Sequence, residues 1–137
     1  MTTPARILLA EDDEIMAAVI EQTLGEEGFD VVLAKDGQAA WDIVKDGSSV
    51  FELFLLDWEM PRMDGMQLLH RLKSEPALSA IPVVMQTAFN DPASIQAGLD
   101  AGAYYYLTKP FLPRVLISVV RAALEQYRDF VRMREPD

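Results

Sequence analysis

The sequence contains no cysteine, which excludes a disulfide framework and thiolate metal sites and is consistent with a reducing compartment. No apolar run approaches the roughly 18–20 residues that a membrane-spanning helix requires. Basic residues are few, because 12 Lys and Arg stand against 22 Asp and Glu, for a net charge of −10. Nucleic acids and anionic membranes should repel such a chain, so we expect protein or cation partners. The first residues run directly into a strand-like segment, so we expect no signal peptide and a location in the cytoplasm.

The length of 137 residues suits one domain and is too short for two. Half of the residues are apolar, which is enough for a proper core in a domain of this size. We therefore expect a single domain over residues 1–137.

Short apolar runs alternate with segments of helical periodicity along the whole chain. The runs, which we expect to be strands, cover residues 6–10, 31–34, 50–56, 81–86 and 104–108. Asp13 is a candidate N-cap for the first helix, and Asp91, followed by Pro92, is one for the fourth. Five strands alternating with five helices predict an α/β fold, a doubly wound parallel sheet with helices on both faces.

The last helix is expected to be long. Apolar residues at helical spacing continue from Val115 to Val131, which predicts a helix over about residues 112–133. Such a helix is roughly 33 Å long, more than a small sheet needs to cover. We expect a C-terminal helix extension over residues 125–137, and it favours either a dimer or a continuation of the chain.

Polar side chains stand at the ends of four expected strands. Glu11 and Asp12 follow the first, Asp57 ends the third, Thr87 ends the fourth and Lys109 follows the fifth. Each has an ordinary explanation by itself, such as a helix cap, a strand end, a turn hydroxyl or a solvated lysine. Ligands of this fold class bind beyond the carboxyl ends of the strands, so the convergence predicts a site there.

The chemistry of this group of residues points to a metal ion and a phosphoryl group. Clustered carboxylates raise one another's pKa unless a cation compensates, and Mg²⁺ suits a few carboxylates with waters and phosphate oxygens. Asp57 is a candidate nucleophile that would form an acyl phosphate. Lys109 would pair with the carboxylate and then with the phosphoryl oxygens, and Thr87 would donate a hydrogen bond to them.

Four sequence segments resemble the receiver domain of two-component response regulators, over roughly residues 5–130. The segments are LLAEDD (Leu8–Asp13), LLDWEMPRMDG (Leu55–Gly65), QTA (Gln86–Ala88) and AGAYYYLTKPF (Ala101–Phe111). The resemblance implies a flavodoxin-like (βα)5 fold with strand order 2-1-3-4-5. It leaves open a free-standing regulator of the chemotaxis or phosphorelay kind, or a receiver followed by an effector domain.

The resemblance also implies a role for each residue of the metal and phosphorylation site. Asp57 corresponds to the phosphorylation site and Asp12 to the direct ligand of Mg²⁺ or Mn²⁺. Glu11 would bind the metal through water, and the main-chain carbonyl of Glu59 would complete the protein ligands. A pairing of Asp12 with Asp13 is a one-residue alternative.

Thr87 and Tyr106 correspond to the family's switch pair, in which the hydroxyl moves to the phosphoryl group and the ring turns inward. Lys109 corresponds to the family's lysine, and its bond to Pro110 is expected to be cis. Gly65 corresponds to the tight turn after the site.

Glu59 and Phe89 depart from the commonest family pattern. The resemblance implies that these positions tune the lifetime of the phosphoryl group, so we expect an altered dephosphorylation rate without a predicted direction. Tyr104 and Tyr105 add aromatic surface at the fifth strand, either as a packed edge strand or as a protein-binding face.

The resemblance implies a protein that accepts a phosphoryl group from a sensor histidine kinase or a histidine phosphotransfer protein. Slow autodephosphorylation is expected, without dedicated substrate turnover. Phosphorylation would rearrange the face of the fourth helix, fifth strand and fifth helix, toward a downstream target, an effector domain or a homodimer. Two alternatives remain: a phosphorylation-independent interaction module of the same fold, and a metal-dependent phosphatase, for which Glu59 is a faint second acid.

Overall fold

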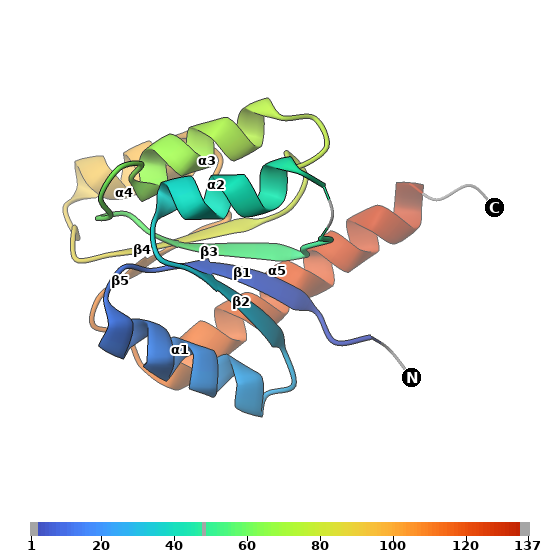
Figure 1. Cartoon of the computed structure of the whole chain (residues 1–137), viewed down its shortest axis with the longest axis horizontal. Helices are drawn as coiled ribbons and strands as arrows, with labels where there is room; N and C mark the ends of the chain where they lie inside the picture. Colours follow the sequence, from blue (N-terminus) through green and yellow to red (C-terminus); the bar gives the residue numbers. More distant parts are fainter. Residues whose placement is uncertain (1–2, 48, 135–137) are drawn as a thin grey trace.

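The computed structural model describes residues 3–47 and 49–134 as five parallel strands alternating with five helices (Figure 1). The order of the strands in the sheet is β2-β1-β3-β4-β5. This order confirms the predicted doubly wound, flavodoxin-like fold. The strands are β1 (Arg6–Ala10), β2 (Asp30–Ala34), β3 (Leu53–Asp57), β4 (Val83–Thr87) and β5 (Tyr105–Thr108).

The helices cover the two faces of the sheet. They are α1 (Glu14–Glu26), α2 (Gly37–Lys45), α3 (Gly65–Ser74), α4 (Pro92–Asp100) and α5 (Pro113–Arg134). Helices α1 and α5 lie on one face, and α2, α3 and α4 lie on the other (Figure 1). No helix within residues 3–47 and 49–134 is long and apolar enough to span a bilayer.

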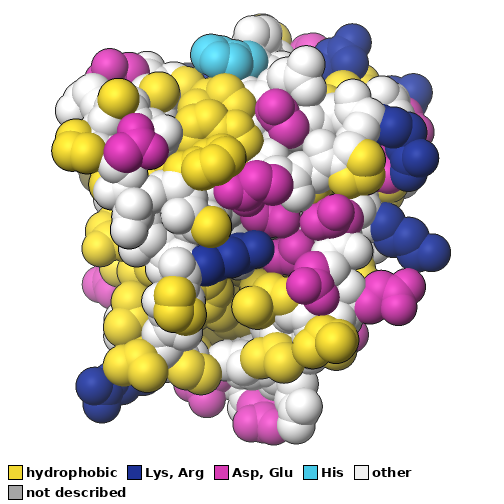
Figure 2. Space-filling model, turned by 90° about the vertical axis from the view of Figure 1, so that its left-hand side faces the viewer, with side chains coloured by type: hydrophobic (Ala, Val, Ile, Leu, Met, Phe, Trp, Pro, Cys, Tyr) yellow, Lys and Arg dark blue, Asp and Glu magenta, His cyan; other side chains and the backbone are white. Residues whose placement is uncertain are grey.

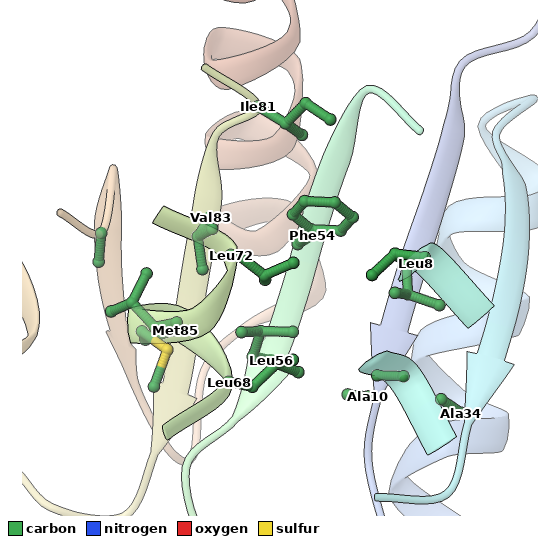
Figure 3. Packing of buried hydrophobic residues seen from close by; sticks show 14 of the residues in the cluster. Leu8, Ala10, Ala34, Phe54, Leu56, Leu68, Leu72, Ile81, Val83 and Met85 are labelled. Carbon is green, nitrogen blue, oxygen red and sulfur yellow. The ribbon is translucent and has the colours of Figure 1, made fainter. Parts of the chain in front are cut away.

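Strand β3 is the centre of both hydrophobic cores, because its side chains alternate between the faces and all of them are buried. Leu55 belongs to the cluster under α1 and α5, whereas Phe54 and Leu56 belong to the cluster under α2 and α3. Figure 3 shows Leu68 and Leu72 of α3 lying close to these two residues. A strand that is buried on both faces needs a nearly continuous apolar sequence, as this one has.

The predicted N-caps are confirmed. The Asp13 carboxylate accepts hydrogen bonds from the first turn of α1, and the Asp91 carboxylate accepts one from Ser94 N–H, with Pro92 at the first helical position. Three strands start later than predicted, and β5 begins at Tyr105 rather than at residue 104. Strand β4 begins at Val83, because Pro82 has no N–H for the ladder. Strand β3 begins at Leu53 rather than at residue 50.

Helix α5 confirms the predicted long last helix, since it spans 22 residues and projects past the end of the sheet (Figure 1). A bidentate ion pair attaches its second half to the start of β3: Arg128 donates to both Glu52 carboxylate oxygens, at 2.8 and 3.0 Å. Phe130 is exposed on this half. Residues 135–137 of the predicted extension lie outside the described residues.

Candidate functional site

Lys109 joins the acids at the carboxyl ends of the strands. Its ammonium nitrogen lies 3.2 Å from a carboxylate oxygen of Asp57 and 3.2 Å from one of Glu11. Both acids are almost fully buried. Figure 2 shows this edge of the molecule, with acidic side chains gathered at its centre and a basic side chain beside them. The structure therefore brings together residues that are up to 98 positions apart in the sequence.

Three carboxylates form a group that could hold a metal ion. One oxygen each of Glu11, Asp12 and Asp57 lies within 4.8 Å of the others, with Asp12 exposed and the other two buried. Oxygen ligands in this number suit Mg²⁺, which keeps several waters and completes its shell with phosphate oxygens. Asp13, the alternative metal ligand, instead caps α1 through its carboxylate.

The electrostatics of the site disfavour an ionised Asp57 when no cation is bound. Burial and the neighbouring Glu11 raise the pKa of Asp57 to about 8, although the Lys109 ammonium acts in the opposite direction. Burial alone would lower the pKa of Lys109, but the carboxylates of Asp57 and Glu11 outweigh it and raise that pKa. A divalent cation would restore the charged form of Asp57, in line with the compensation expected for clustered carboxylates.

Thr87 is fully buried, and its hydroxyl is hydrogen-bonded to Glu59 and Phe89. The hydroxyl donates to a Glu59 carboxylate oxygen at 2.6 Å and accepts a hydrogen bond from Phe89 N–H at 3.0 Å. Burial acts to raise the pKa of Glu59, but the hydrogen bond from Thr87 contributes to a net lowering. The sequence singled out Glu59 and Phe89 without predicting these contacts.

The Tyr106 ring already points inward in this structure. Only 8% of the residue is exposed, and its hydroxyl donates to the Phe89 carbonyl oxygen at 2.9 Å. Its ring packs in an edge-to-face arrangement with Trp58, with 6.0 Å between the ring centroids. Trp58 packs in the same way with Phe89. Helix α4 comes so close that a Cβ on Gly98 would lie 2.8 Å from the Tyr106 ring. Tyr105 is exposed whereas Tyr104 packs against the α1/α5 core, so only Tyr105 adds clear aromatic surface.

The loop between β3 and α3 is fixed at both ends. A Cβ on Gly65 would collide with the main-chain carbonyl of Asp57, which explains the glycine at the predicted tight turn. Arg62 adopts a φ of 68°, and its guanidinium pairs with the buried Asp36 carboxylate at the start of α2. This ion pair was not predicted, because an arginine gives no signal for the left-handed region.

Two further features surround the acids. The bond between Lys109 and Pro110 is cis, as expected. An open hollow of about 530 Å³ lies beside Asp12, with Trp58 and Phe89 among its lining residues.

The comparisons with known proteins agree with this geometry. Residues 7–121 match the family described as the response regulator receiver domain. The response regulator RppA of a Synechocystis species is 37% identical over 117 residues, which are 85% of this chain and 49% of RppA. A chemotaxis protein CheY homolog of Campylobacter jejuni is 34% identical over 112 residues, 81% of this chain and 85% of the homolog.

A solved structure, the signal receiver domain of a histidine kinase from Syntrophus aciditrophicus, superimposes with a TM-score of 0.82 at 32% identity. The match covers 89% of this chain and 91% of that one. The chain thus spans about half the length of RppA and most of the length of the CheY homolog. It belongs to the response regulator receiver domains of two-component systems.

Proposed function

We propose that Asp57 accepts a phosphoryl group from the phosphohistidine of a sensor histidine kinase or a histidine phosphotransfer protein. An Asp57 carboxylate oxygen attacks phosphorus, and the bond from phosphorus to the donor's imidazole nitrogen breaks as the acyl phosphate forms. The observation that carries the proposal is the ammonium of Lys109 bridging Asp57 and Glu11 beside a third carboxylate. A merely structural strand end would not need this group of charges.

Asp12, Asp57 and the main-chain carbonyl of Glu59 would hold Mg²⁺ or Mn²⁺ directly, with Glu11 acting through water. When bound, the metal neutralises the charge on the transferred phosphoryl oxygens. The raised pKa of Asp57 supports this assignment, since the carboxylate needs a cation to stay ionised at neutral pH.

Lys109 then moves from the Asp57 carboxylate toward the phosphoryl oxygens, and the Thr87 hydroxyl leaves Glu59 to donate to the same group. Tyr106 contacts the main chain of Phe89, so a shift of this segment reaches α4 and β5. The α4–β5–α5 face would then bind a downstream protein, an effector domain or a second copy of the chain. We place this single receiver domain, residues 1–137, in the cytoplasm.

Intact-mass spectrometry after incubation with acetyl phosphate and Mg²⁺ tests the proposal. We expect a gain of one phosphoryl mass that is absent from Asp57→Asn. The matched control is Asp64→Asn, which changes an acid on the same edge whose carboxylate caps α3. No adduct on the wild-type chain would leave a phosphorylation-independent interaction module, whereas turnover of free phosphomonoesters would indicate a phosphatase.

A further inference from the structure

Gln86 in β4 is fully buried, and neither of its amide atoms has a hydrogen-bond partner among the described residues. The other buried polar side chains among the described residues all form hydrogen bonds. They are Glu11, Asp36, Asp57 and Thr87. A buried, unpaired amide destabilises the folded state, and such a group in a native protein needs an explanation.

The position of Gln86 in the sheet places it next to the phosphorylation site. It lies opposite Asp57 on one side and opposite Leu107 on the other. Val84 faces the α1/α5 core and Met85 the other core, so Gln86 faces α1 and α5. Asp57 faces the same way, because Leu55 does.

The side chain of Lys109 reaches across the carboxyl end of Gln86's strand. Lys109 follows β5, whereas its partner Asp57 ends β3, and β4 lies between these strands. The lysine must therefore pass over β4 near its carboxyl end, where Gln86 lies. The register thus places Gln86 next to Asp57, the carboxylate that Lys109 also contacts.

We propose that Gln86 is a positioning residue whose amide becomes paired only in the phosphorylated state. This inference rests on the proposed function of Asp57. When Lys109 moves to the phosphoryl oxygens, it vacates an oxygen of Asp57, and the Gln86 amide N–H donates to that oxygen. An amide suits this place better than a carboxylate, because it donates a hydrogen bond without adding negative charge to Glu11 and Asp57.

The inference predicts that stability and function change in opposite directions. Gln86→Met keeps the length of the side chain and removes the unpaired polar atoms, so the melting temperature should rise by about 3 °C. Beryllium fluoride, which mimics the phosphoryl group on Asp57, should bind about tenfold more weakly in the presence of Mg²⁺. Binding of Mg²⁺ alone should not change, because Gln86 is not among the metal-site carboxylates.

Fluorine NMR of bound beryllium fluoride, a Mg²⁺ titration and thermal unfolding provide the three measurements. Met85→Leu is the matched control, since it alters the adjacent buried residue on the other face of β4. Unchanged beryllium fluoride binding by Gln86→Met would overturn the inference. A destabilised or unfolded variant would overturn it too, because the amide would then be paired at rest. A wild-type chain that binds no beryllium fluoride and forms no acyl phosphate would contradict the proposed function itself, and this inference with it.

Discussion

Replacing Glu59 with alanine should favour the proposed phosphorylated state, because Glu59 accepts the hydrogen bond of the hydroxyl that we propose donates to the phosphoryl group. In this structure the Thr87 hydroxyl has a single proton, and it is donated to the Glu59 carboxylate at 2.6 Å. Under the proposed function, a phosphoryl group on Asp57 would compete for that proton. Glu59→Ala removes the competing acceptor and leaves in place the main-chain carbonyl of Glu59 that we assign to the metal.

The size of the effect follows from the geometry of this hydrogen bond. A short bond between a hydroxyl and a carboxylate contributes about 1.5–3 kcal/mol when it is desolvated. Thr87 is fully buried but Glu59 is exposed, which reduces the contribution to about 1 kcal/mol. Since 1.4 kcal/mol corresponds to a factor of ten, beryllium fluoride should bind about fivefold more tightly to Glu59→Ala.

Two companion variants separate charge from hydrogen bonding. Glu59→Gln retains an acceptor for Thr87 without the charge, and it should show a smaller gain than Glu59→Ala. Glu14→Ala removes an exposed acid from the first turn of α1, and it should leave the affinity close to that of the wild type. Unchanged or weaker binding by Glu59→Ala in a fluorine NMR titration would refute the competition between Glu59 and the phosphoryl group.

Two further predictions concern the Tyr106 ring and the Asp57 carboxyl. Gly98→Ala should destabilise the protein by about 1 kcal/mol in urea unfolding, because the added Cβ displaces the Tyr106 ring. The control Gly25→Ala should stabilise the protein, because an added Cβ there has nothing within 4 Å. A gain in stability at both positions would contradict this packing of Gly98 against Tyr106. Without divalent ions, the raised pKa of Asp57 makes the free energy of unfolding depend on pH. The contribution of the protonated Asp57 to this free energy is fully present below about pH 4 and is lost as the pH rises through about 8. Urea unfolding between pH 5 and 9 should show this loss in the wild type and not in Asp57→Asn; equal profiles would show that Asp57 ionises normally.

The predicted fold was correct because burial on both faces leaves a clear trace in the sequence of a parallel sheet. The strand boundaries were less accurate, because burial and strand pairing are different properties. Phe51 and Ile81 are buried, yet both precede the first residue of their strands. An apolar run therefore overestimates the length of a strand wherever the chain enters the core before it joins the ladder.

The convergence of the acids and Lys109 was predictable from topology, whereas several contacts around them were not. Parallel strands end at the same edge, so strand assignments alone were enough to bring Glu11, Asp57 and Lys109 together. The bond from Thr87 to Glu59 depends on the path of the loop after β3. That path is set by the φ of Arg62 and the close approach of Gly65 to Asp57, and only the glycine has a sequence signal.

Gln86 shows that a polar residue inside an apolar strand is itself a sequence signal. It belongs to the QTA segment, and the strand predicted over residues 81–86 already includes it. The period of two puts Gln86 on the face of Val84, and a strand with neighbours on both sides buries that face. A buried amide is more informative than a buried leucine, because it costs stability and needs a compensating role. Polar residues within a predicted central strand therefore identify candidate functional positions from the amino-acid sequence alone.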